Sequence, residues 1–372
     1  MKAEQALDSG KPAGPETLEL RSVPGFIVFD LPAALSSAGG TRLAPDVSVT
    51  EVALLARAMT YKFAALGAPV GGAKAGIVGD PADLADRAEL MSRYCAEIAP
   101  LLSSGRFLTG PDMGTFEEDF APLRESRAAP SAMSAVVGGV PFEDLLTGFG
   151  VTVAAETALR ARASTGWAGC RVAIEGFGKV GGGVAREVTE RGGRVVAIST
   201  VAGTIADAAG LDIDRLLTLR REYGDGCITH YGRAVDPVAR LFTVEADVVV
   251  PGARPGSISG SVAESLASCV SVVAPAANVP YTRAGAEVLR QRQIAALPDF
   301  VSNAGAVIGY RSHPHATPDE VLTAVQDKIT EIMRAALSHP GGPLVGGCER
   351  AAAFLRSWWG EPPDPPFAED QS

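Results

Sequence analysis

The sequence has few charged side chains and no cluster of basic ones. Charged residues make up 20% of the chain, acidic residues outnumber basic ones by 43 to 33, and no basic run is longer than a pair. Binding to a nucleic acid or an anionic membrane surface needs clustered lysine and arginine. The composition therefore argues against both partners and favours a small-molecule ligand.

The sequence also lacks paired cysteines, an apolar leader and a membrane-length apolar run. Without a C-x-x-C pair, neither a metal site nor a disulfide framework is indicated, and we expect reduced thiols in a cytoplasmic protein. The first twenty residues contain no secretory apolar segment, and about the first fifteen are expected to form a loose tail. The uncharged stretch 265–282 contains prolines and an asparagine that a lipid-facing helix would not tolerate.

The chain is long enough, at 372 residues with 47% hydrophobic side chains, for two domains with their own cores. Residues 25–30 are predicted to form a strand, followed by a small-residue turn over 36–43. The capping signature at Ser48 predicts a helix that runs to Gly67. A second strong helix is predicted from Thr317 to before Pro340, and a last one over 349–359.

Three polar residues stand out in the first part of the chain. Lys62 falls at the edge of an apolar helical stripe, Lys74 is surrounded by glycines, and Asp112 lies in a Gly-Pro-Asp-Met-Gly turn. A lysine among glycines is suited to an anionic or carbonyl substrate, because backbone amides can approach the ligand there. A snorkelling lysine, a turn lysine and an Asx-turn aspartate would give the same patterns, and each alternative stays open here.

From Arg171 the sequence alternates between strand-like and helix-like segments, which is typical of parallel βαβ units. Strands are predicted over 172–175, 195–199, 247–250, 270–273 and 294–297. A G-x-G-x-x-G motif follows the first of these strands and precedes a helix, as a dinucleotide pyrophosphate requires. The candidate cofactor-binding residues of this motif are Gly176, Gly178, Lys179, Val180 and Gly181.

The second predicted strand ends without the carboxylate that usually holds the adenosine ribose. Ser199 and Thr200 stand there, and their hydroxyls can bond a ribose without repelling a 2′-phosphate. No arginine directly follows Thr200 to hold such a phosphate. The sequence therefore favours NAD as cofactor and leaves NADP possible.

Together these segments resemble the glutamate, leucine, phenylalanine and valine dehydrogenase family. The motifs that match in order are GGTRL at 39–43, AMTYK at 58–62, GGAK at 71–74, GPDMGT at 110–115, TGFGV at 147–151, GFGKVG at 176–181 and PDFVSNAGAVI at 298–308. The resemblance covers most of the chain. It implies an α/β protein with an N-terminal substrate and oligomerisation domain over 1–145 and a Rossmann-type NAD(P)-binding domain over 146–308. The C-terminal helices of 309–372 are expected to pack back on the first domain, and the protein is expected to form a homo-oligomer.

The resemblance implies reversible oxidative deamination of an L-amino acid to a 2-oxo acid and ammonia. Lys62 would bind the substrate α-carboxylate with help from the backbone around Gly39 and Gly40. Lys74 would act on the reacting water and carbonyl oxygen, and Asp112 would exchange protons with the amine.

Other matched positions are expected to orient the cofactor and the substrate. Thr147 and Asn278, with its neighbour Ala277, would bind the cofactor, and Asn303 would position the substrate beside the nicotinamide.

The substrate side chain is expected to be bulky and aliphatic or aromatic. Ala38 stands where glutamate enzymes of the family carry a lysine for the side-chain carboxylate, and Tyr310 replaces a serine on the same wall. Gly110 and Val307 complete a roomy, largely apolar wall. Arg311 would admit an acidic substrate if it turned inward. The alternatives are therefore a glutamate-type enzyme and a non-catalytic NAD-binding paralogue.

Overall fold

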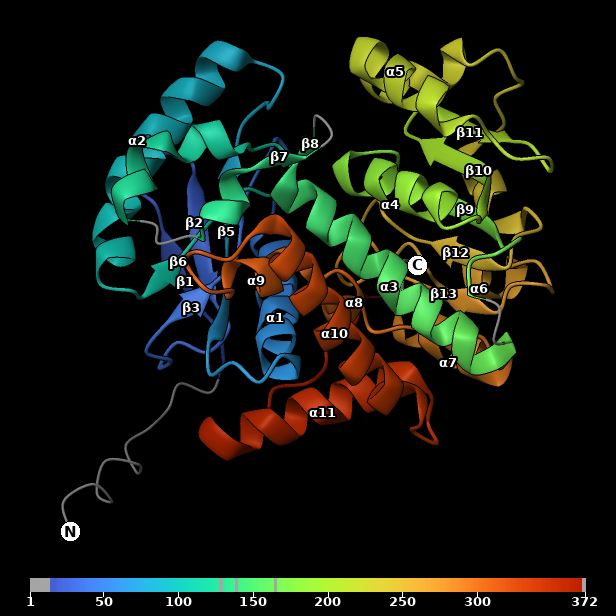
Figure 1. The fold of residues 1–372 in the computed structure, drawn as a ribbon. Coiled ribbons are helices and arrows are strands. Elements are labelled where there is room, and N and C mark those ends of the chain that lie inside the picture. The colour runs from blue at the N-terminus through green and yellow to red at the C-terminus, as the bar shows by residue number, and fades with distance from the viewer. Residues whose placement is uncertain (1–13, 127–129, 138–139, 164–165, 370–372) are drawn as a thin grey trace. The chain divides into compact units, whose positions relative to one another are not determined.

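The computed structural model describes residues 14–126, 130–137, 140–163 and 166–369. Their contacts divide them into two compact units (Figure 1). The first consists of residues 14–126 with Phe354–Pro366, and the second of the remaining described residues. No helix in the described ranges has the length and apolar character needed to cross a membrane.

The first unit is built on a mixed sheet with the order β1-β2-β5-β3-β6, and β4 also pairs with β5. Its strands are β1 (Glu16–Glu19), β2 (Gly25–Phe29), β3 (Ser37–Ala38), β4 (Thr41–Ala44), β5 (Gly71–Val78) and β6 (Phe107–Leu108). Its helices are α1 (Val49–Ala65), α2 (Leu84–Ser103) and the 3-10 segment η1 (Glu117–Ser126). The side chains of α1 and α2 enter two separate apolar clusters with alternate residues of β2, so the helices cover opposite faces of the sheet.

Helix α1 starts where its capping residue predicts. The Glu51 amide donates to Ser48 Oγ at 3.2 Å, which satisfies one of the free N–H groups of the first turn. The predicted turn over 36–43 is wrong in part, because β3 and β4 lie within it and both run parallel to β5. Small residues permit this, since an ideal Cβ at Gly39 would lie 1.7 Å from the carbonyl oxygen of Ala73.

The second unit contains a six-stranded sheet with the order β11-β10-β9-β12-β13-β14, in which only β11 is antiparallel to its neighbour. Its strands are β9 (Arg171–Glu175), β10 (Arg194–Thr200), β11 (Gly203–Ala206), β12 (Val248–Val250), β13 (Val272–Val273) and β14 (Ala295–Ala296). A small hairpin consists of β7 (Val136–Val137) and β8 (Val140–Pro141). The five predicted strands are confirmed within one or two residues. Strand β11, which pairs antiparallel with β10, was not predicted.

The helices of the second unit are α3 (Phe142–Ala163), α4 (Lys179–Glu190), α5 (Ile213–Tyr223), α6 (Gly260–Ser265), α7 (Arg283–Gln291), α8 (Asp299–Ser302), α9 (Gly305–Tyr310), α10 (Pro318–Leu337) and α11 (Pro343–Trp358). The 3-10 segments are η2 (Ser131–Ser134), η3 (Gly224–His230) and η4 (Val238–Thr243). The start of α10 has the predicted capping residue, with a reciprocal bond between Thr317 and Glu320. Helix α11 begins six residues before the predicted start at 349.

The compact units differ from the predicted domain limits. Helix α3 crosses the predicted boundary at 145/146 and packs as a whole on α4, α9 and α10 of the second unit. Helix α10 belongs to the same unit, whereas Phe354–Pro366 joins the first unit. There the carbonyl of Asp364 accepts a hydrogen bond from Arg57 on α1. The packing of the C-terminal helices of 309–372 on the first domain stays a prediction.

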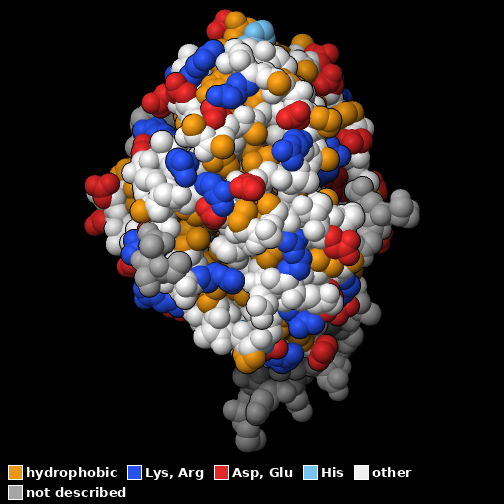
Figure 2. Space-filling view, turned by 90° about the vertical axis from the view of Figure 1, so that its right-hand side faces the viewer, with side chains coloured by type: hydrophobic (Ala, Val, Ile, Leu, Met, Phe, Trp, Pro, Cys, Tyr) orange, Lys and Arg blue, Asp and Glu red, His pale blue; other side chains and the backbone are white. Residues whose placement is uncertain are grey.

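Charged side chains of both signs are dispersed over the face of the molecule that Figure 2 shows. Figure 2 shows one face of the molecule, where lysines and arginines alternate with aspartates and glutamates among uncharged groups. This mixed pattern differs from the continuous basic surface on which phosphate backbones bind.

Candidate active site

Lys74 lies on β5, in the interior of the first sheet. Strand β5 pairs with β2 on one side and with β3 and β4 on the other, so the lysine is not the turn residue of the alternative interpretation. Its side chain is only 3% exposed. An ideal Cβ at Gly72 would lie 1.9 Å from the carbonyl oxygen of Ala56, and this close approach of α1 explains why glycine precedes the lysine.

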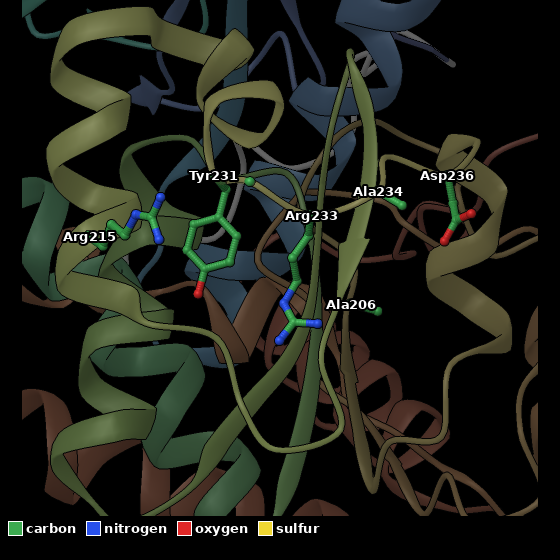
Figure 3. A pocket seen from close by; sticks show the side chains of 7 residues that line it. Ala206, Arg215, Tyr231, Arg233, Ala234 and Asp236 are labelled. Atoms are coloured by element: carbon green, nitrogen blue, oxygen red, sulfur yellow. The ribbon is translucent and has the colours of Figure 1, made fainter.

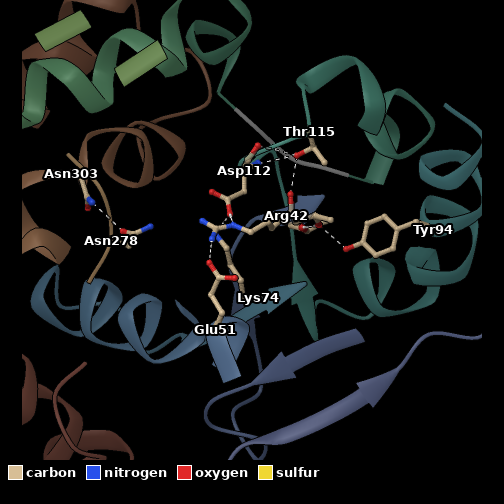
Figure 4. Close-up of polar contacts among 10 residues, drawn as sticks. Arg42, Glu51, Lys74, Tyr94, Asp112, Thr115, Asn278 and Asn303 are labelled. Atoms are coloured by element: carbon tan, nitrogen blue, oxygen red, sulfur yellow. Dashed lines mark hydrogen bonds and ion pairs between the residues drawn. The ribbon is translucent and has the colours of Figure 1, made fainter. Parts of the chain in front are cut away.

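Asp112 faces Lys74 from the turn that follows β6. Lys74 Nζ lies 3.1 Å from Asp112 Oδ2 (Figure 4). Thr115 fixes the turn, because its Oγ1 accepts from the Asp112 amide at 2.9 Å and donates to the Thr41 carbonyl at 2.9 Å. The aspartate thus combines the predicted turn geometry with a direct contact to the candidate acid–base lysine.

Arg42 on β4 is the third member of this cluster. Its Nε donates to Asp112 Oδ2 at 3.1 Å, and its Nη1 forms an ion pair with Glu51 at the start of α1. Neighbouring hydroxyls fix the beginning of β4, because Thr41 Oγ1 lies 2.7 Å from the Tyr94 hydroxyl. Arg42, Lys74, Asp112 and Glu51 therefore form one connected cluster of ionisable side chains, of which Lys74 and Arg42 are buried.

The charges and the burial of this cluster shift the pKa values of Lys74 and Asp112. Burial lowers the pKa of Lys74, and the positive charge of Arg42 lowers it further, although Asp112 acts in the opposite direction. Burial would raise the pKa of Asp112, but Lys74 and Arg42 outweigh it and bring the value to about 2. Asp112 is thus ionised at neutral pH, whereas burial shifts Lys74 toward its neutral form.

The glycine pair of the predicted carboxylate site borders this cluster. An ideal Cβ at Gly40 would lie 3.3 Å from Lys74 Nζ and 2.7 Å from the Pro111 carbonyl oxygen, so a side chain there would crowd the lysine. The Gly110 carbonyl accepts from the Thr41 amide at 2.9 Å. Ala38 on β3 pairs with Gly72, two residues before Lys74 in β5. The structure therefore brings Gly40, Lys74 and Asp112 together.

Lys62 is buried in the last turn of α1, with 5% exposure. A buried ammonium group needs a polar or charged partner or an aromatic ring. Its predicted role toward a substrate carboxylate stays a prediction.

In the second unit, the structure brings the two predicted asparagines together. Asn303 Nδ2 donates to Asn278 Oδ1 at 3.0 Å and to the Ala276 carbonyl at 3.3 Å (Figure 4). Thr147 lies on α3, and its amide nitrogen would be 3.2 Å from an ideal Cβ at Gly305. The start of α9 therefore packs directly against the part of α3 that carries Thr147.

The two other wall positions lie on α9. Val307 is half-buried, and the Tyr310 hydroxyl donates to Glu143 Oε2 at 2.8 Å. The tyrosine therefore has a carboxylate beside it, which the sequence alone did not indicate. Arg311, at the end of α9, has an exposed side chain.

The glycine motif has the geometry that a dinucleotide needs. Gly176 adopts φ +79°, and an ideal Cβ at Gly181 would lie 1.9 Å from the Gly176 carbonyl oxygen. Helix α4 starts at Lys179, so its free N–H groups face the loop, and apart from Gly178 and its chain neighbours no described residue has an atom within 4 Å of an ideal Cβ at Gly178. This open cradle at a helix N-terminus fits a pyrophosphate.

The other predicted cofactor residues lie on α4, at the end of β10 and in the segment after β13, all in the second unit. Val180 is half-buried, and Lys179 lies 3.4 Å from Asp144. The Ala277 amide donates to the Pro251 carbonyl at 3.1 Å, which fixes the segment before Asn278. Ser199 Oγ is buried without a hydrogen-bond partner among the described residues. The fit of these residues to NAD(P) rests on the glycine cradle and on that unused hydroxyl.

Family comparisons agree with this geometry. The family model described as "Glutamate/Leucine/Phenylalanine/Valine dehydrogenase" matches residues 138–339, and the model of its dimerisation domain matches residues 12–127. The chain belongs to this family. It is therefore placed among the amino acid dehydrogenases, oxidoreductases that act on a CH–NH2 group with NAD(P).

Among the relatives of this family member, glutamate dehydrogenase A2 of Halobacterium salinarum is 35% identical over 283 residues, or 73% of this chain and 67% of the relative. The NAD-specific glutamate dehydrogenase of Staphylococcus aureus is 32% identical over 72% of this chain and 66% of its own length. The hetero-hexameric glutamate dehydrogenase of Thermus thermophilus, solved in a Leu-bound form, superimposes with a TM-score of 0.77 and 26% identity. That alignment covers 93% of this chain and 88% of the other.

Arg42 and Glu51 were missed as site residues of this dehydrogenase. Arg42 was visible as the charged residue of the GGTRL motif, and Glu51 was assigned only to helix capping. Sequence spacing does not show which side chains converge in space, so the contacts of Arg42 with Asp112 and with Glu51 became visible only in the fold.

Proposed function

We propose that this chain catalyses the reversible NAD(P)-dependent oxidative deamination of an L-amino acid, with L-glutamate as the leading substrate. The contact that supports the reaction is the buried pair of Lys74 and Asp112 at 3.1 Å. A lysine with a lowered pKa beside a fixed carboxylate is suited to general acid–base chemistry on water and an amine.

In this proposal Lys62 and the backbone at Gly39 and Gly40 bind the substrate α-carboxylate. The neutral amine of Lys74 takes a proton from the attacking water and returns one to the departing oxygen in the reverse direction. Asp112 accepts a proton from the substrate amine and gives it back when ammonia leaves. The nicotinamide, when bound, accepts the hydride of the α-carbon.

Glutamate is the leading candidate because the relatives that match at 35% and 32% identity are glutamate dehydrogenases. A side-chain carboxylate needs a cation, and Ala38 cannot supply one. Arg311 is the candidate, since its exposed side chain follows the wall residue Tyr310 directly in sequence. We therefore assign Arg311 to the side-chain carboxylate of the substrate.

A bulky aliphatic or aromatic amino acid is the second candidate. Ala38 is small, and Tyr310, a predicted wall residue, donates a hydrogen bond to the Glu143 carboxylate, whose charge would repel an acidic substrate bound beside it. An apolar side chain would meet no such repulsion. This observation keeps the second candidate in direct competition with glutamate.

The deciding experiment measures consumption of NADH and NADPH by the full chain with ammonium and a panel of 2-oxo acids. We expect turnover with 2-oxoglutarate that Lys74→Ala abolishes and that Arg311→Ala lowers by raising KM. A maximum on a branched or aromatic 2-oxo acid, unchanged by Arg311→Ala, would establish the second candidate. Silence across the panel, with the nucleotide still bound, would indicate a non-catalytic paralogue.

The match to a dimerisation domain over residues 12–127 supports a homo-oligomer. Light scattering coupled to size-exclusion chromatography would give its mass. A mass equal to that of one chain at assay concentration would contradict this part of the proposal.

A further inference from the structure

The adenosine end of the cofactor site has an unusual charge balance. Strand β10 ends at Ser199 and Thr200, where a carboxylate would select the free ribose hydroxyls of NAD. Ser199 is 1% exposed and its Oγ has no partner among the described residues, while Thr200 Oγ1 donates to the Asp225 carbonyl at 2.7 Å. This strand end therefore carries no negative charge of its own.

A cation reaches the glycine loop from a distant part of the sequence. Arg220 lies in the last turn of α5, and its Nη1 donates to the carbonyl oxygen of Phe177 at 2.5 Å. Phe177 is the residue between the first two glycines of the motif. The guanidinium thus lies beside the turn over which the adenosine and pyrophosphate of a dinucleotide pass.

The bond from Thr200 to Asp225 holds this arrangement together. Asp225 lies in η3, which follows α5 directly, so the last turn of α5, the start of η3 and the end of β10 are neighbours. Arg220 makes one hydrogen bond within the described part of the chain, and the planar fork of its guanidinium has further N–H donors to offer. A phosphate group can use several of these donors at once.

We propose that Arg220 binds the adenosine 2′-phosphate of NADP and that this chain prefers NADP over NAD. The hydroxyl-lined end of β10 accepts the phosphate because it carries no carboxylate to repel it. Arg220 supplies the positive charge that no residue just after Thr200 provides.

The acidic residues in this region are Glu222 and Asp225, whose side chains are exposed, and Glu175, which pairs with Ser199 across β9 and β10 and accepts a hydrogen bond from the Ala253 amide at 3.3 Å. If Asp225 turned inward to hold the ribose hydroxyls, it would take the part of the missing carboxylate and favour NAD. Asp225→Asn distinguishes a site in which Arg220 binds a 2′-phosphate from one in which Asp225 binds the ribose hydroxyls. The substitution weakens NADH binding only if Asp225 binds the ribose.

The test uses two fragments that contain no nicotinamide, so it is independent of the amino acid substrate and of turnover. Calorimetric titration of the full chain compares adenosine 2′,5′-bisphosphate with 5′-AMP. We expect the bisphosphate to bind more tightly by roughly tenfold or more, since charge-assisted bonds to a phosphate are among the strongest. Arg220→Gln is expected to remove that advantage and leave the affinity for 5′-AMP unchanged, and Arg220→Lys to retain part of it.

Arg215 provides the matched control on the same helix. Its guanidinium stacks on the ring of Tyr231, 4.9 Å from the centroid, in an open pocket formed with Arg233 and Ala206 (Figure 3). Arg215→Gln removes the same charge from α5 at a different place and is expected to leave both affinities unchanged. An equal loss in Arg215→Gln would show a general effect of charge and overturn the assignment.

The reciprocal variant is Thr200→Glu, which returns a carboxylate to the end of β10. We expect it to weaken the bisphosphate and to shift the ratio of kcat/KM toward NADH. Equal binding of the two fragments by the natural chain, or a loss of NADH binding in Asp225→Asn, would overturn the proposal. Thermal unfolding of each variant shows whether it retains the fold.

Discussion

Lys74 Nζ and Asp112 Oδ2 lie 3.1 Å apart, on a central strand and a fixed turn of the first unit. The two residues are separated by 38 positions in sequence, and the parallel pairing of β3 with β5 and β6 brings their segments side by side. The chemistry proposed for this protein therefore depends on the register of the first sheet as well as on the two side chains.

Replacing Lys74 by alanine should abolish turnover without loss of nucleotide binding. General acid–base groups contribute roughly 10²–10⁴-fold to rate, and we expect a loss of that size in kcat. Initial rates with saturating NADPH and ammonium measure it. Lys328→Ala on the exposed face of α10 is the matched control. Equal rates in both variants would remove Lys74 from the chemistry.

Replacing Arg42 by glutamine should move the pH profile to higher pH. The Arg42 cation lowers the pKa of Lys74, so its removal raises that pKa, and the amine becomes neutral only at higher pH. The acid limb of kcat/KM is expected to shift accordingly. Glu51 acts on Lys74 with the opposite sign, so Glu51→Gln should move the limb to lower pH. Arg42→Lys retains the charge, and a profile displaced as far as that of Arg42→Gln would contradict the electrostatic explanation.

Replacing Gly178 by alanine should weaken nucleotide binding without changing the stability of the fold. Apart from Gly178 and its chain neighbours, no described residue has an atom within 4 Å of an ideal Cβ there, so we expect the melting temperature to be unchanged. The methyl group would occupy space that the pyrophosphate needs, and NADPH affinity should fall. Fluorescence titration and thermal unfolding measure the two effects. Gly183→Ala on α4, where the nearest contact is an ordinary 3.8 Å, should leave both unchanged.

Lysine at Ala38 tests the substrate wall directly. Ala38→Lys introduces a cation on β3 and should raise kcat/KM for 2-oxoglutarate relative to that for apolar 2-oxo acids. The ratio of the two constants is the measurement, because it is insensitive to the fraction of active protein. Ala38→Met adds comparable bulk without charge and should not raise that ratio. A similar gain in both variants would mean that the position does not contact the substrate side chain.

The sequence predicted the elements whose signals are local. Ser48 and Thr317 precede helices because the side-chain oxygen of each accepts a hydrogen bond from the backbone amide three residues later. The strands around Gly176 follow from apolar runs next to glycines. It did not predict β3 and β4, because the two strands are only two and four residues long and flank Gly39 and Gly40, a pair that is typical of a turn.

Contacts between distant segments were likewise outside the reach of local patterns. Arg42 was quoted within a motif but not assigned, because its partners Glu51 and Asp112 come from a helix and a turn that only the fold brings together. Arg220 lies twenty residues after Thr200, whereas the familiar sequence pattern has the phosphate-binding arginine close to the end of the second strand. In both cases the sequence shows the arginine, but only the fold shows toward which partners its side chain points.

The tight packing of β5 also bears on how this protein can evolve. Any side chain at Gly72 or Gly39 would meet backbone atoms at less than 2 Å, so drift at those positions is blocked by main chain that cannot yield. Ala38 and Gly110 lie nearby without being fully enclosed. In the proposed site, substitutions at Ala38 and Gly110 can therefore alter the substrate wall while the strand that carries Lys74 stays unchanged.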